Sequence, residues 1–286
     1  MTNINSQNMV IKPIKNTRAI PLLIFSLSPC IPFKQLSLSA LTSLALFLCI
    51  FLYSSLSWSS LPITDTDPLA KALNYEARYH ARIKGLNVKG IKTIKKTGDN
   101  RYQASWKAKA LWMKIDEWSE FEITKDNMIR PIQYHYQKKG FGKNEKINLY
   151  FDWENQRLIG ETIKSKTVDK KQFSLTPGVQ NKLTYQIQMQ LDLISNSLTG
   201  SLPETLSYHI ASDRDLEQYL FTRKNEASGN RKLDKKNLTV FSRQKKNRLV
   251  EIHLDQDIFF IPALIRQSKN DKTNDIHLSD WQLLIN

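Results

Sequence analysis

Hydrophobic and polar residues alternate along much of the chain after residue 74. Successive side chains of a β-strand point to opposite faces, so a period of two is typical of antiparallel strands with one buried and one solvated face. The alternation is clearest in residues 75–84, 102–112, 132–137 and 147–153.

Turn-forming residues separate these segments, at 98–100, 126–127, 138–140 and 213–215. Strands at this spacing, without helical patterns between them, predict a mainly β domain. We expect a curved antiparallel sheet that forms an open or barrel-like structure.

One segment has a helical period. Its apolar residues recur every three or four positions over about five turns, which predicts an amphipathic helix. Pro177 precedes the segment, and Gly200 and Pro203 follow it as stop signals. Among so many strands, such a helix is expected to cover an open sheet face or plug a barrel mouth. The stripe comprises Val179, Leu183, Ile187, Leu191, Ile194 and Leu198.

The first 57 residues have another composition. Residues 1–34 carry four basic and no acidic side chains, residues 36–53 carry no charge, and Ser55 and Ser57 follow. A basic region, an apolar region and small residues in this order predict a secretory signal peptide. The apolar stretch is also just long enough to cross a bilayer, so a retained membrane anchor stays open.

Both readings place residues 61–286 outside the cytoplasm as one exported antiparallel β domain. With a cleaved signal the domain would be periplasmic. With an anchor it would be held at the inner membrane, facing the periplasm. Cys30 and Cys49 both lie in the first fifty residues, so the domain has no disulfide, no thiolate metal site and no cysteine nucleophile.

No motif indicates an enzyme. The chain lacks a nucleophile elbow, a zinc-protease helix motif and a phosphate-binding glycine loop. The five histidines lie on the polar phase of their predicted strands, which favours solvated surface positions over metal ligation. We therefore expect no catalytic residue, no metal site and no cofactor.

Charge and aromatic residues indicate two candidate binding regions. Removing the four basic residues of the leader from 42 leaves 38 against 27 acidic residues, a net charge of +11 for the exported domain. Nucleic acid is an unsuitable partner for an exported protein, whereas anionic envelope polymers or lipid head groups would be attracted. The candidate basic face comprises Lys138, Lys139, Lys143 and Lys146.

The second region is a stripe of aromatic residues on the apolar phase of the strands. Such residues fill the core of most β proteins, but they line a ligand cavity when a barrel is too wide to fill. The candidate cavity residues are Tyr79, Trp106, Trp112, Tyr134 and Trp153.

Several short motifs occur in a characteristic order. They are Tyr75–Tyr79, Arg130–Tyr134, Phe151–Trp153, Pro177–Gln180, Tyr208–Ala211, Tyr219–Phe221 and Ile261–Pro262. Together they resemble the bacterial domain-of-unknown-function family 3108 over nearly all of residues 73–281. Asn181 departs from the family, which usually has an aspartate there, and residues 225–237 are unusually basic and polar.

The resemblance implies a signal-bearing periplasmic or outer-envelope protein with a curved, barrel-like β fold. That fold is related in shape to the open barrels of the lipoprotein-localisation pathway, which enclose acyl chains. The resemblance carries no catalytic residue.

Two functions stay open. In the first, a non-enzymatic envelope protein binds a lipid or a lipoprotein acyl chain inside its β domain, with the helix of residues 179–198 as a lid. In the alternative, an envelope assembly or structural factor binds protein or anionic polysaccharide through a basic outer face. An uncleaved leader would add a membrane contact.

Overall fold

The computed structural model describes residues 72–140, 144–164, 167–224, 237–270 and 272–284. These residues belong to one compact unit that spans residues 61–286. The expected signal or anchor segment and Lys143 lie outside the described residues. Within the described ranges, every helix is too short or too polar to span a bilayer.

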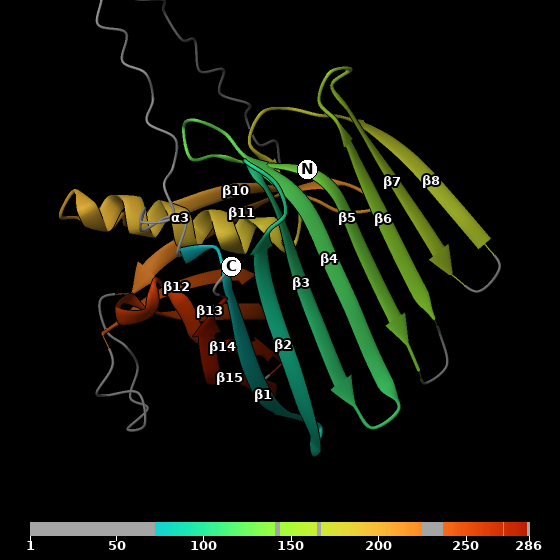
Figure 1. Cartoon of the computed structure of the whole chain (residues 1–286). Coiled ribbons are helices and arrows are strands. Elements are labelled where there is room, and N and C mark those ends of the chain that lie inside the picture. The colour runs from blue at the N-terminus through green and yellow to red at the C-terminus, as the bar shows by residue number, and fades with distance from the viewer. Residues whose placement is uncertain (1–71, 141–143, 165–166, 225–236, 271, 285–286) are drawn as a thin grey trace, which may run out of the picture. The chain divides into compact units, whose positions relative to one another are not determined.

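Two antiparallel meanders form a single sheet (Figure 1). The first runs from β1 to β8 and the second from β10 to β15, and β1 pairs with β15 to join them. At the two edges lie β8 and the short strand β9, which pairs in parallel with β10. The expectation of a mainly antiparallel β domain is confirmed.

The strands of the first meander are β1 (Tyr75–Ile83), β2 (Leu86–Lys96), β3 (Arg101–Ala110), β4 (Met113–Ile123), β5 (Ile129–Lys139), β6 (Glu145–Asp152), β7 (Arg157–Lys164) and β8 (Thr167–Ser174). After β9 (Val179–Gln180) and the helix α3 (Thr184–Leu198), the second meander comprises β10 (Thr205–Ala211), β11 (Leu216–Lys224), β12 (Leu238–Lys245), β13 (Arg248–Asp255), β14 (Ile261–Lys269) and β15 (Lys272–Leu283). A 3₁₀ turn, η1 (Gln256–Ile258), connects β13 to β14.

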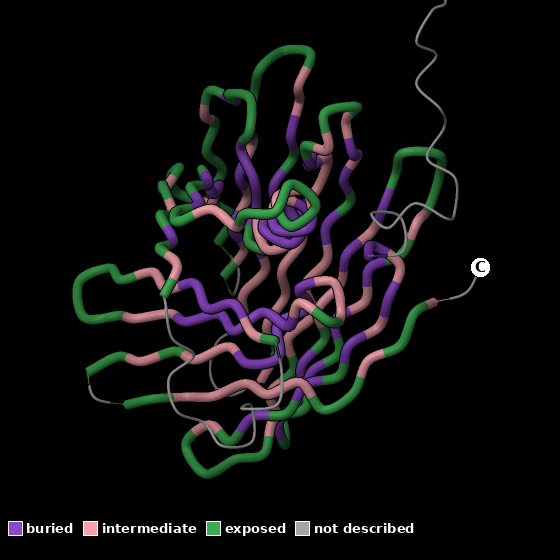
Figure 2. Tube along the Cα trace, turned by 90° about the vertical axis from the view of Figure 1, so that its left-hand side faces the viewer, coloured by how far each residue is buried: buried purple, intermediate pink, exposed green. Residues whose placement is uncertain are grey.

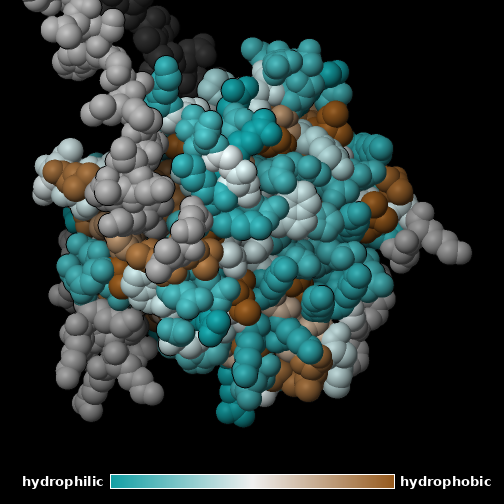
Figure 3. All heavy atoms as spheres, viewed as in Figure 1, coloured by the Kyte–Doolittle hydropathy of each residue, from teal (hydrophilic) through white to brown (hydrophobic). Residues whose placement is uncertain are grey.

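The period of two sorts the side chains between the faces of the sheet. In β1, Tyr75, Ala77 and Tyr79 are buried, while His80 and Arg82 are exposed. The outer surface of the first meander is correspondingly hydrophilic over most of its area (Figure 3). The curved sheet therefore buries its inner face.

The helix begins later than its apolar stripe predicts. Val179 lies in β9, and Leu198 is 72% exposed at the end of α3. The buried Asn181 side-chain oxygen accepts hydrogen bonds from the backbone N–H groups of Leu183 and Thr184, at 3.0 Å each. This turn ends the extended segment and starts the helix, so the predicted range 179–198 was too long at its N-terminal end.

The helix has two buried faces. Ile187 and Leu191 pack into the core of the first meander, and Met189, Leu193 and Ile194 pack into that of the second. Figure 2 views α3 nearly end-on, with strands on several sides of it. It is therefore a wedge between the two halves, so of the two expected roles, a cover over an open sheet face and a plug in a barrel mouth, the first was wrong.

Side chains, rather than a strand ladder, tie this wedge to the first meander. The Gln180 side chain donates to the backbone oxygen of Ile129 (2.8 Å), and the Gln188 side-chain oxygen accepts from the Ile129 N–H (2.6 Å). Asn181 donates to the Ser119 hydroxyl on β4 at 2.8 Å. Both backbone polar groups of the buried Ile129 are thus satisfied by glutamines.

The two meanders each contain a proline at a β-bulge. Pro131 in β5 lies opposite Phe121, where the β4–β5 register shifts, and Pro262 in β14 lies opposite Leu254, where the β13–β14 register shifts. Proline lacks the N–H that a ladder requires, and bulges are among the few places in a sheet that tolerate it. Both bulges bend the sheet around α3.

We predict that Gln188→Leu lowers the free energy of unfolding by about 2 kcal/mol, because it leaves the buried Ile129 N–H without an acceptor. Urea unfolding followed by circular dichroism measures the change. Gln172→Leu on the exposed edge strand β8 is the matched control and should stay within about 0.5 kcal/mol of the parent. Equal effects of the two substitutions would contradict the role given to Gln188.

Candidate functional site

The inner face of the second meander changes from apolar to basic toward its hairpin turns. The apolar positions lie near α3, where Phe241 and Ile252 are buried in the core. Every second residue of a strand lies on this face, and nearer the hairpin turns these residues are polar. On β12 it carries Phe241, Arg243 and Lys245, and on β13 it carries Ile252, Val250 and Arg248.

Three adjoining cavities lie inside the curved sheet. An outer compartment of about 890 Å³ opens at the hairpin turns of the second meander. It shares Glu117, Gln186 and Val250 with a middle compartment of about 180 Å³. A third compartment of about 140 Å³, which we call the inner compartment, shares Tyr79, Trp106 and Ile276 with the middle one and extends to Ile83 and Met113 beside the β1–β2 and β3–β4 turns. The series runs from a basic opening to an apolar end.

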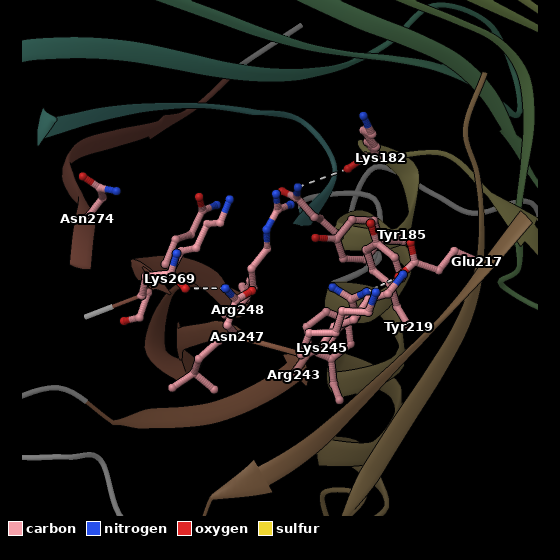
Figure 4. A pocket seen from close by; sticks show the side chains of 18 of the residues that line it. Lys182, Tyr185, Glu217, Tyr219, Arg243, Lys245, Asn247, Arg248, Lys269 and Asn274 are labelled. Carbon is pink, nitrogen blue, oxygen red and sulfur yellow. Dashed lines mark hydrogen bonds and ion pairs between the residues drawn. The ribbon is translucent and has the colours of Figure 1, made fainter. Parts of the chain in front are cut away.

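Basic side chains from separate elements surround the outer compartment (Figure 4). Arg243 and Lys245 both pair with Glu217, and the Arg243 guanidinium lies 3.6 Å from the ring centre of Tyr219. The remaining basic residues of this lining form no ion pair within the part of the chain that the structure describes. They are Lys182, Lys246, Arg248 and Lys269. Their unpaired charges give the opening a positive potential.

A lysine and a glutamate lie deeper, in the wall of the middle compartment. Lys92 on β2 is the cross-strand neighbour of Trp106 on β3, which in turn neighbours Glu117 on β4, so all three point to the same face. Lys92 is only 4% exposed, and within the described part of the chain its Nζ has one hydrogen-bond acceptor, Gln186 Oε1 at 3.5 Å. Glu117 accepts a hydrogen bond from the Tyr134 hydroxyl at 2.6 Å.

Burial shifts the pKa of each of these two side chains in the direction that favours its neutral form. Desolvation lowers the pKa of Lys92 to about 8, against a smaller opposing effect of Glu117. Desolvation likewise raises the pKa of Glu117, and the hydrogen bond from Tyr134 offsets part of that rise. At neutral pH the Lys92 amine therefore keeps its charge with little compensation from the protein.

Trp106 and Tyr79 separate the middle from the inner compartment. Their rings meet edge to face, with centroids 5.5 Å apart. Gly90 on β2 makes room for the indole, since a Cβ atom at that position would overlap the Trp106 ring. The Tyr79 hydroxyl is buried and, among the described residues, has no hydrogen-bond partner.

A comparison with models of protein families identifies the family of this chain. The model of a family described as "Protein of unknown function (DUF3108)" matches residues 74–257. The chain belongs to the DUF3108 family. The resemblance seen in the sequence motifs is thereby confirmed.

One solved structure similar to this DUF3108 chain is a beta-barrel-like protein of the domain of unknown function DUF1849 from Brucella abortus. The two share 9% sequence identity with a TM-score of 0.48, over 76% of this chain and 100% of the other. The search of curated proteins gives no match.

In the structure of this DUF3108 domain, the five predicted cavity residues lie in different environments. Tyr79 and Trp106 line the cavities. Tyr134 donates a hydrogen bond to the cavity-lining Glu117. Trp153 packs against the core of the first meander, and its indole N–H donates to the backbone oxygen of Pro131 at 2.6 Å. Trp112 is 58% exposed and was wrongly assigned to the inner face. Its neighbour Leu111 has a positive φ of 46° in the β3–β4 turn, which ends the alternation before Trp112.

Among the described lysines predicted to form a basic face, Lys138 lies on the opposite face of the sheet from Lys139 and Lys146. Lys138 and Lys139 are consecutive in β5 and point to opposite faces of the sheet. Lys138 lies opposite Glu145 across the β5–β6 ladder, and Lys146 lies opposite Gln137. Lys143 is outside the described residues. The basic residues that do converge are those of the outer compartment.

No sequence motif indicated Lys92 or Glu117, because both residue types are normally solvated. Strand phase provides the signal that could have found them: Ile94 is buried, and two residues back along β2 lies Lys92. His253, expected at the surface, is only 1% exposed, since β13 is buried on both faces. Across the described residues, His, Cys, Asp and Glu form no group able to hold a metal ion.

The pKa of Lys92 predicts a pH effect on stability. An unfolded lysine titrates near 10.5 and the folded Lys92 near 8, so between these pH values the unfolded state binds more protons and stability rises with pH. Below about pH 8 the amine is charged in both states, and the full cost of burial remains.

We therefore expect Lys92→Met to be more stable than the parent at pH 7, with an advantage that shrinks by about 2 kcal/mol between pH 8 and pH 10. Urea unfolding of both proteins across this range measures the difference between their free energies of unfolding. The contributions of the other titrating groups are common to both proteins and cancel in this difference. A gap that stays constant with pH would show that Lys92 is not desolvated.

Proposed function

We propose that this domain is a non-enzymatic binding protein of the cell envelope that holds an amphipathic ligand, such as a lipid or an acyl chain, within its curved sheet. The observation that carries the proposal is the series of adjoining interior cavities, apolar at one end and basic at the other. Ligand sites are typically concave and mostly apolar, with a few convergent polar groups.

Small side chains support the proposal. Protein interiors are normally close-packed, and voids larger than a water molecule are few. Here the inner compartment is bordered by Ala81, Gly90, Ala108 and Ala110, all of which point inward from neighbouring strands. A core without a ligand would be stabilised by larger apolar residues at the three alanine positions.

The cellular location in this proposal comes from the sequence. The basic, apolar and small-residue order of residues 1–57 supports export to the periplasm or anchoring at the inner membrane. In either place lipids and acylated proteins are the abundant apolar partners. The contrast between a basic opening and an apolar end suits a ligand with one polar and one apolar part.

We predict that Ala108→Leu weakens binding of decan-1-ol by about tenfold, since the added methyl groups occupy the space that the alkyl chain would fill. Isothermal titration calorimetry on the purified full chain measures the affinity. Ser105→Leu places the same side chain on the opposite face of β3 and should leave binding unchanged. The proposal fails if the parent protein binds no decan-1-ol, or if both substitutions have the same effect.

A further inference from the structure

The middle compartment contains hydrogen-bond donors that the protein leaves underused. The buried Tyr79 hydroxyl has no partner among the described residues. The Lys92 ammonium has three donor hydrogens and, among the residues that the structure describes, donates only the long hydrogen bond to Gln186. Both residues line this same compartment, but the Tyr79 hydroxyl oxygen itself is buried, which leaves the Lys92 ammonium as the donor offered to a ligand there. A buried ammonium with one weak acceptor costs free energy, so its place on a cavity wall indicates an acceptor that is supplied from outside.

The surrounding groups favour an anionic acceptor. Glu117 on β4 is the carboxylate that faces the same space, and the Tyr134 hydroxyl already donates to it. From the α3 side the wall adds Tyr185 and Gln186, with Lys182 at the entrance, and β14 adds the neutral Gln267. Glu117 interacts electrostatically with both Lys92 and Lys182, so with Lys182 counted this region has two positive charges against one negative charge, an excess that favours a negatively charged oxygen group.

Resting on the binding function proposed above, we propose that Lys92 binds an anionic oxygen group, a carboxylate or a phosphate, at the head of a single-chain amphiphile. The alkyl part then lies in the inner compartment, past the Tyr79–Trp106 pair. The ligand is thus an acid with one alkyl chain, oriented with its charge in the middle compartment.

The basic outer compartment has a different part in this arrangement. Lys182, Arg248 and Lys269 lie in an open region where water screens their charges. Charges at a rim mainly increase the association rate, whereas a buried charge in direct contact determines how long the ligand stays. The rim guides the anion inward, and Lys92 holds it.

The test compares decanoate, decyl phosphate and decan-1-ol on the purified full chain at pH 7 by calorimetry. The parent protein should bind both anions at least about tenfold more tightly than the alcohol, as expected for a charge-assisted hydrogen bond in a buried site. Lys92→Met should remove this preference, because it lowers the affinity for the anions at least about tenfold more than the affinity for decan-1-ol.

Lys89→Met is the matched control, because it removes one positive charge from the exposed face of the same strand. It should keep the preference for the anions. Thermal unfolding checks each variant, and Lys92→Gln, which keeps a donor without the charge, decides the case if Lys92→Met does not fold. The double variant Arg248→Gln, Lys269→Gln should slow association and weaken its salt dependence while leaving dissociation unchanged.

The possible failures are distinct. Equal binding of anions and alcohol by the parent, or an anion preference that survives Lys92→Met, overturns the role of Lys92 and leaves the binding function intact. Loss of the preference only in the double variant would place the anion at the rim and overturn the inference as well. Absence of binding by every probe would overturn both.

Discussion

The contact of two glutamines with the backbone of Ile129 determines how the rest of the molecule is arranged. A sheet whose two edges do not pair in a ladder must satisfy its buried backbone groups in another way. Gln180 and Gln188 do so for Ile129, and they belong to the segment that enters the sheet as β9 and α3. The sheet therefore closes around a helix through side chains, without becoming a continuous barrel.

This mode of closure creates the interior space. Because α3 occupies the region between the two cores, the meanders are held apart at their hairpin ends, where the inner faces are no longer in contact with it. The adjoining cavities lie in this region. The alanines of β3 keep it open, and Trp106, whose ring packs over Gly90, divides it.

Two charged groups on the inner wall have a cost in stability. Burying an ammonium with one weak acceptor is unfavourable, and an apolar residue of similar size would be tolerated or preferred at the same position. A core built for stability alone would not place Lys92 next to Trp106. The arrangement is explained more readily by binding than by folding, because binding is the process that gains from donors held ready in a dry site.

The sequence by itself determined the fold class and the family. Alternation along the strands reflects the two faces of a sheet, a local property of the chain, and the same holds for the helical stripe from Ile187 to Ile194. The order of short motifs identified the DUF3108 family before any coordinates. Tyr79 and Trp106 were found in the same way, since their strand phase places them on the inner face.

Only the tertiary structure decided which residues meet. The start of α3 depends on Asn181, whose side chain bonds both the helix start and β4. Trp112 follows the apolar phase in sequence, but a turn with positive φ exposes it. Lys92 and Glu117 are charged residues on an inward phase, and the basic residues of the outer compartment come from hairpins far apart in the chain. Such contacts depend on how the sheet curls around the helix, a long-range property that no local pattern of residues contains.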